Sequence, residues 1–257
     1  MIRSDPGTAE VLKPYLIADD FLSTNPPMPK RFVIDFSPQT ILEAEAYGPA
    51  MQRVKRMVLT ARQKNAEKEE ARNKEALAEN PQARLNHHHR NFLRKWWLHS
   101  YPRPALLKRV RALPCYVACG QVTKRPIFVF VSSAISPNAA LEVFTFADDY
   151  SFGILQSDIH WRWFVERCST LKGDFRYTSN TVYDSFPWPQ SATLGQIRGI
   201  SKAATELRQF RAEVMSQRGY TLRELYRTLE LPGDNPLKQS HARLARISHQ
   251  RDRGQSR

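Results

Sequence analysis

The feature that most constrains the fold is a stretch of strand-forming sequence with helix-type sequence on either side. Three segments rich in β-branched and aromatic residues lie between turn signals, at residues 115–122, 126–133 and 140–146. Apolar residues recur at helical spacing before them, in residues 47–61, and after them, in residues 197–214. The sequence therefore predicts an α+β fold in which a β-rich part joins separate helical segments.

Local signals predict where the first helical part begins and how it continues. Residues 30–36 (KRFVIDF) have a strand pattern, and Ser37-Pro38 after them predicts a helix start with Ser37 as N-cap and Pro38 at the first helical position. Residues 62–80 are highly charged, of mixed sign and nearly without apolar side chains. This composition predicts a solvated helix with supporting ion pairs, and a spacer that projects away from the body is the alternative.

The β-rich part is expected to contain an inserted helix. We predict one helix over residues 150–171, followed by a turn at Gly173-Asp174 and a strand-like segment at residues 175–183. Two aromatic residues between prolines, Phe186–Pro189 (FPWP), predict a packed corner that ends this part.

Two further helix starts follow. Thr221 and Glu224 have the spacing of a capping box that opens a short helix. Asn235-Pro236 has the pattern of another helix start.

The charge of the chain favours a polyanionic partner. Its 257 residues include 39 Lys or Arg and 25 Asp or Glu, a net charge of +14. Half of this excess falls in residues 190–257, and the Arg-rich end from Arg243 to Arg257 predicts a disordered basic tail. Neutralising phosphates releases condensed counterions, so nucleic acid is a natural partner. A basic protein without a nucleic-acid role is the alternative.

Cysteine usage and hydropathy indicate a compartment. Three cysteines in a long chain argue against a disulfide framework and for reducing conditions. The N-terminus lacks a signal-peptide core, and no run approaches the roughly 18 apolar residues of a membrane span. We expect a soluble cytoplasmic protein without a membrane partner.

The sequence offers no convincing catalytic or cofactor site. Asn25-Pro26-Pro27-Met28 resembles the Asn-Pro-Pro-aromatic motif of amino-group methyltransferases, but no buried strand precedes it, and Met28 replaces the ring that stacks on the flipped base. The 10 glycines include no Gly-x-Gly, and S-adenosylmethionine requires a glycine-rich turn. We predict no catalytic residue and no cofactor-binding residue in this chain.

Metal binding is also not expected. Cys115 and Cys119 lie on one face of a predicted strand as core residues, and Cys168 completes no zinc-like pattern. His87–His89 are expected in a surface loop, and His160 is expected to be a packed helix residue.

Polar residues interleaved with aromatic ones are candidates for reading DNA. Arginine pairs bidentately with guanine and asparagine with adenine, and Lys124 and Arg125 between two strands could hold phosphates. An ordinary basic hairpin is the alternative. The predicted DNA-binding residues are Lys124, Arg125, Lys172, Arg176, Tyr177, Ser179 and Asn180.

An ordered set of motifs connects the chain to a known family. The segments are YVACGQVTK at residues 116–124, FGILQS at 152–157, His160-Trp161, RYTSNTVYDSFPWP at 176–189 and LRELYRTLELPGDNPLKQSHARL at 222–244. In this order they resemble the C-terminal target-recognition region of MmeI-like single-chain DNA adenine-N6 methyltransferases of type II restriction–modification systems.

The resemblance implies a division of labour. In the family this region reads duplex DNA, while a separate domain holds S-adenosylmethionine and methylates adenine at N6. The resemblance implies a junction to that domain (residues 1–36), a helical linker (37–104), a β-rich target-recognition domain (105–190) and C-terminal helices (191–247). The chain departs from the family at its end, where the composition predicts a basic tail (248–257).

The expected partners are double-stranded DNA and a separate methyltransferase catalytic subunit. The alternatives are a divergent DNA-modifying enzyme with an unfamiliar site and a nonfunctional remnant of a split gene.

Overall fold

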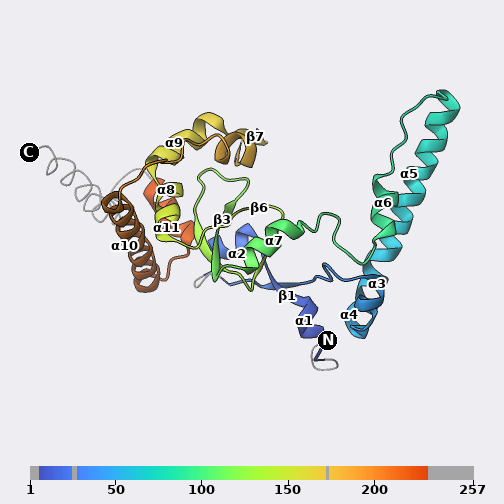
Figure 1. Cartoon of the computed structure of the whole chain (residues 1–257), viewed down its shortest axis with the longest axis horizontal. Coiled ribbons are helices and arrows are strands. Elements are labelled where there is room, and N and C mark those ends of the chain that lie inside the picture. The colour runs from blue at the N-terminus through green and yellow to red at the C-terminus, as the bar shows by residue number, and fades with distance from the viewer. Residues whose placement is uncertain (1–5, 25–27, 172–173, 231–257) are drawn as a thin grey trace, which may run out of the picture. The chain divides into compact units, whose positions relative to one another are not determined.

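A computed structural model describes residues 6–24, 28–171 and 174–230 of the chain (Figure 1). The chain divides into two units. The first unit combines residues 1–15, 31–116 and 132–136, and the second combines residues 16–30, 117–131 and 137–257. Helices and small sheets coexist, which confirms the predicted α+β class. The C-terminal helices and residues 18–23 belong to the same unit as most of the β-rich part.

The first unit is mainly helical. Its β1 and β2 are antiparallel, with Leu12 opposite Ile34, and β5 (Ser136–Pro137) lies on the other side of β1. In chain order the elements of this unit before β5 are α1 (Thr8–Val11), β1 (Leu12–Leu16), β2 (Arg31–Ile34), α3 (Ile41–Glu45), α4 (Gly48–Val54), the π-helical turn η1 (Lys55–Leu59), α5 (Thr60–Glu79), α6 (His88–Arg94) and α7 (Pro104–Arg111).

The predicted helix start at Ser37-Pro38 is wrong. The helix α3 begins at Ile41, and its N-cap is Thr40, whose hydroxyl accepts a hydrogen bond from the Glu43 amide. The Glu43 carboxylate accepts one from the Thr40 amide in return, at 2.7 Å. Ser37 lacks an acidic partner three residues later, so the reciprocal capping box decides the boundary.

Helical structure continues from α4 through η1 into α5, as the spacing in residues 47–61 predicts. A small apolar core, formed by Val11, Phe36, Ala44, Ala50 and Met51, anchors its beginning. The core does not extend along α5.

The charged helix α5 is confirmed, but it is not uniformly solvated. Glu69 is buried, and its carboxylate accepts hydrogen bonds from the amides of His89 and Arg90 at the start of α6, at 2.8 and 3.0 Å. Arg62 donates to carbonyls at the other end of α6, and Asn73 exchanges two hydrogen bonds with the Asn86 backbone. Positions 62, 69 and 73 share one helix face, so polar side chains perform the docking there.

The prediction of a surface loop at His87–His89 needs correction. His88 is the first residue of α6, and the amide of His89 is held by Glu69. The chain turns helical here because α5 supplies the acceptor that the first amides of a helix otherwise lack.

The second unit contains two small sheets. In the first the strand order is β4-β3-β6, with Val117 opposite Phe144, and in the second β7 pairs with β8. Its elements are α2 (Ala18–Ser23), β3 (Cys115–Gly120, which starts in the first unit), β4 (Val129–Ser132), β6 (Leu141–Phe144), α8 (Asp149–Leu155), α9 (Asp158–Arg167), β7 (Ser169–Leu171), β8 (Asp174–Arg176), the π-helical turn η2 (Ser179–Tyr183), α10 (Leu194–Arg218) and α11 (Leu222–Glu230).

The single helix predicted over residues 150–171 is two helices, α8 and α9. They are separated at Ser157, whose hydroxyl caps α9 by accepting from the His160 amide at 3.1 Å. Asp148 caps α8 in the same way, through the Ser151 amide. The continuous apolar pattern hides this break because both helices bury one face in the same core.

An aromatic core holds the second unit together. Its buried members come from β3 and β6, from α8, α9, η2 and α10, and from the residues just before β4 and just after β8: Val117, Cys119, Phe128, Phe144, Phe152, Leu155, Phe164, Tyr177, Val182 and Ala204. The helices α8 and α10 approach closely at Gly153, where an added Cβ would lie 2.7 Å from Cγ2 of Ile200. Only a glycine allows this spacing.

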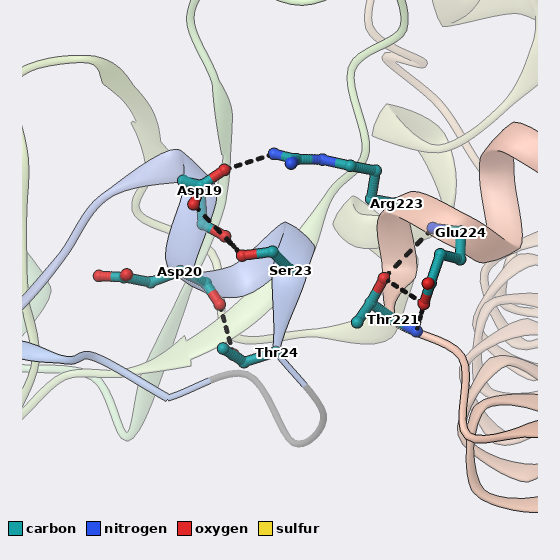
Figure 2. Close-up of polar contacts among 7 residues, drawn as sticks. All are labelled: Asp19, Asp20, Ser23, Thr24, Thr221, Arg223 and Glu224. Carbon is teal, nitrogen blue, oxygen red and sulfur yellow. Dashed lines mark hydrogen bonds and ion pairs between the residues drawn. The ribbon is translucent and has the colours of Figure 1, made fainter.

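The predicted helix start at Thr221 is confirmed. Thr221 and Glu224 form the capping box of α11, with the Thr221 amide donating to the Glu224 carboxylate at 2.8 Å (Figure 2). Leu222 and Leu225 are buried, as is Phe21 of α2, which packs against α11. On the surface of this contact Arg223 donates to Asp19 at 2.5 Å (Figure 2).

Several sequence predictions lie outside the described residues. They concern Asn25–Pro27, Lys172, the helix start at Asn235-Pro236 and the basic tail. Among the helices that the structure describes, none is both long enough and apolar enough to cross a membrane.

Candidate nucleic-acid interface

The strand β8, which contains Arg176, forms backbone hydrogen bonds on both of its sides. On one side β8 pairs with β7, with Arg176 opposite Ser169. On the other side lies the chain that leaves β3, because the Thr123 amide donates to the Phe175 carbonyl at 2.9 Å and the Tyr177 amide to the Gln121 carbonyl at 2.7 Å. The fold thus places Val122 opposite Arg176, although more than 50 residues separate these two in sequence, and the segment that pairs with β8 continues into Lys124 and Arg125.

Strand alternation separates Arg176 from its neighbours. Phe175 and Tyr177 face the aromatic core, so Arg176 faces the opposite side of the strand. Its side chain is half-buried, and its Nε is shielded without a hydrogen-bond partner among the described residues. An unsatisfied shielded donor costs free energy, which an acceptor that reaches it would recover.

The structure argues against the predicted role of Tyr177 in DNA binding. Its side chain is 0% exposed and its hydroxyl lies 3.0 Å from Nε2 of His160. Burial raises the pKa of Tyr177 far above its usual value. The physical reason is again strand alternation, which directs every second side chain into the core.

His160 is the packed helix residue that the sequence predicts. It is 0% exposed, and burial lowers its pKa to about 4. The ring of Phe186 lies 4.9 Å from the His160 ring, which confirms Phe186–Pro189 as a packed corner. The imidazole is therefore neutral near pH 7 and positions the segment rather than binding phosphate.

Ser179 and Asn180 do not lie on a strand. The strand β8 ends at Arg176, and both residues begin the turn η2, where the Asp184 amide donates to the Ser179 carbonyl at 2.8 Å. The buried Val182 anchors this turn, and Nε1 of Trp163 donates to its carbonyl at 3.1 Å. Both side chains are exposed at the tip of a rigidly held turn.

Two arginines lie on tryptophan rings of α9. The guanidinium of Arg125 is 4.7 Å from the centre of the Trp161 ring, and that of Arg167 is 4.8 Å from the centre of the Trp163 ring. A stacked guanidinium keeps its edge N–H groups available in the plane, where phosphate can accept two of them. Sequence reasoning missed Arg167, although its spacing four residues after Trp163 on a helix is a usable signal.

Lys124 and the three cysteines are the remaining candidates from the sequence. Lys124 is exposed. The cysteines Cys115, Cys119 and Cys168 are free, and burial raises the pKa of the Cys119 and Cys168 thiols. The described ranges contain no group of three or more His, Cys, Asp or Glu that could hold a metal ion.

Comparisons with known proteins match this region and the fold. The family model described as the MmeI target recognition domain matches residues 123–190. DNA methyltransferase A of Bacillus subtilis (strain 168) is 35% identical over 98 residues, which are 38% of this chain and 10% of that protein. A solved structure of the Type IIL restriction-modification enzyme MmeI in complex with DNA matches 95% of this chain with a TM-score of 0.65 at 19% identity.

The extent of these matches sets what they mean. The chain spans about a tenth of the length of the curated relative and 28% of the solved chain. The matched residues 123–190 contain β7, β8, η2 and every described residue of the predicted interface. The expected resemblance is confirmed, because residues 123–190 match the model of the MmeI target recognition domain.

Proposed function

We propose that this chain reads a short sequence in duplex DNA through the surface around β8. The carrying observation is that the target recognition domain match covers β8 with Arg176 and also Lys124 and Arg125, which directly follow the segment paired with β8. Arg176 and Asn180 contact base edges, with Ser179 beside them. Lys124, Arg125 and Arg167 hold phosphates.

The supporting geometry suits the two roles. Base reading requires a side chain whose direction is fixed by packed neighbours. Phe175 and Tyr177 provide this for Arg176, and Val182 with Trp163 provides it for the Asn180 turn. Phosphate holding requires only charge at a suitable distance, which the exposed Lys124 and the two stacked arginines offer.

Site selection on three variants tests this assignment. Arg176→Ala should cost roughly 1–3 kcal/mol at one base position and flatten preference there, because a bidentate contact is lost. Lys124→Ala should weaken all sequences alike. Arg198→Ala on the exposed face of α10 is the control and should leave both preference and affinity unchanged.

The salt dependence of binding is a second readout. The three proposed phosphate contacts imply an affinity loss of roughly fortyfold between about 50 and about 200 mM salt. If Arg176→Ala weakens every sequence equally and keeps the preferred site, the reading role of this residue is refuted. A chain that binds no duplex at low salt refutes the proposal as a whole.

We further propose that methyl transfer takes place in a separate catalytic domain or subunit, which holds S-adenosylmethionine and methylates adenine at N6. The relatives support this, since one is named a DNA methyltransferase and one a restriction-modification enzyme. The cytoplasm is the expected location. Incorporation of labelled methyl groups into DNA by the isolated chain would contradict this division of labour.

A further inference from the structure

The first unit contains a pocket of its own, away from the matched domain in sequence. It has a volume of about 410 Å³ and lies where α5 meets the end of α6 and the segment that follows. Phe92, Leu98 and Pro102 supply apolar lining, and Arg94, Lys95 and His99 supply basic lining. No acidic residue belongs to the lining within the described part of this unit.

Arg62 builds the pocket. One terminal nitrogen of its guanidinium donates to the carbonyls of Phe92 and Lys95, at 2.8 and 3.0 Å. The other donates to the Leu98 carbonyl at 2.9 Å and to the Ser100 hydroxyl at 3.3 Å. These carbonyls at the end of α6 would otherwise present partial negative charge to a ligand. Arg62 neutralises them and has little donor capacity left.

The side chains of Arg94 and Lys95 remain available. Both are exposed, and no carboxylate in the described residues pairs with either. Basic groups beside apolar walls concentrate the local positive potential, because the walls exclude solvent that would screen it. The arrangement suits an anion with a spread negative charge and not a cation.

We propose that this pocket binds phosphate groups of the DNA backbone, held by Arg94 and Lys95 at its mouth. The proposal rests on the proposed DNA binding of the chain and adds a contact that the matched domain does not contain. The contact is independent of base sequence, since it involves phosphates alone. It therefore adds affinity and salt dependence without changing the preferred site.

The test compares two charge-matched double variants of the full chain in duplex-binding titrations over a range of salt. Arg94→Gln with Lys95→Gln removes the pocket charges. Lys68→Gln with Arg72→Gln removes two exposed charges from α5 outside the pocket. Arg62 is left intact because its loss would disturb the end of α6. Inorganic phosphate at matched ionic strength serves as a competitor.

The pocket variant should lose roughly tenfold in affinity per lost contact at about 0.1 M salt, with a salt slope smaller by about two contacts and an unchanged preferred site. The α5 variant should change neither. Equal losses in both variants, or none in the pocket variant, overturn the inference while leaving the recognition proposal intact. Competition by millimolar phosphate that the pocket variant abolishes would indicate a small-anion site and overturn it. A chain that binds no duplex removes both proposals.

Discussion

Different interactions hold the two units together. In the second unit, aromatic side chains from distant segments meet in one core, and a buried hydrogen bond joins His160 to Tyr177. In the first unit, α5 extends beyond the small apolar core and holds α6 with Arg62, Glu69 and Asn73. Burial of apolar surface is non-directional, whereas hydrogen bonds to helix ends fix one geometry. A short helix with few apolar contacts therefore depends on hydrogen bonds to its ends.

This contrast matters for function. A base-reading side chain requires a stiff support, and the aromatic core places one directly beneath β8. A contact to the DNA backbone tolerates more motion of the protein side chains. The hydrogen bonds between α5 and α6 are therefore sufficient support for the proposed phosphate pocket.

The largest effect is expected from Tyr177→Ala in the aromatic core. Removing a fully buried aromatic ring leaves a cavity and should lower the free energy of unfolding of the second unit by roughly 3–5 kcal/mol. Hydrogen exchange of core amides measures this for each unit separately. Tyr177→Phe isolates the hydroxyl and should cost less, and the exposed Ser179→Ala is the control. Equal values for both tyrosine variants would show that the ring contributes little.

The next effect is a pH dependence of the same core. The pKa of His160 is lowered by burial to about 4, against about 6.5 in an unfolded chain. Between these values the unfolded state binds the extra proton. Stability is therefore fully present above about pH 6.5 and is lost as pH falls towards 4, by about 3 kcal/mol.

Hydrogen exchange of second-unit core amides at several pH values checks this dependence. The control is His99→Gln, since His99 is exposed and should leave the pH profile unchanged. His160→Gln should lower stability at pH 7 and flatten the profile. A profile that keeps its slope in His160→Gln would assign the pH dependence to other groups.

A local effect is expected from Glu69→Gln in the polar scaffold. Burial opposes ionisation of Glu69, but hydrogen bonds from the His89 and Arg90 amides lower its pKa overall. The neutral variant weakens both bonds and the interaction with the start of α6. Exchange of the His89 and Arg90 amides should accelerate severalfold, while the second unit stays unchanged. Glu67→Gln, exposed on the same helix, is the control, and equal acceleration there would refute the cap.

The smallest effect concerns the surface pair of Asp19 and Arg223, where α2 meets α11 (Figure 2). Both side chains are more than half exposed, so solvent screens their attraction. Arg223→Ala should cost less than about 1 kcal/mol, as exposed pairs generally do. Leu225→Ala beneath it should cost more, because Leu225 is buried. A larger loss for Arg223→Ala, measured by thermal unfolding, would mean that the ion pair and not apolar packing joins these helices.

The sequence determined the features that depend on neighbours along the chain. Periodicity indicated the three strands of the main sheet, the charged helix and the long α10, and the spacing of Thr221 and Glu224 indicated a capping box. The ordered motifs indicated the recognition domain. The same local reasoning misplaced one helix start, because Ser37-Pro38 and Thr40 with Glu43 are competing signals a few residues apart.

Only the tertiary structure decided which polar residues face outward. Tyr177 and Arg176 are adjacent in sequence, yet pairing on both sides of β8 places one in the core and the other opposite it. The sequence around Glu69 is as charged as that around its exposed neighbours, yet Glu69 is buried where it accepts hydrogen bonds from the amides of α6. Val122 and Arg176 become neighbours through a strand contact that no local pattern encodes. Long-range pairing sets these positions, and it depends on which distant surfaces bury the most apolar area together.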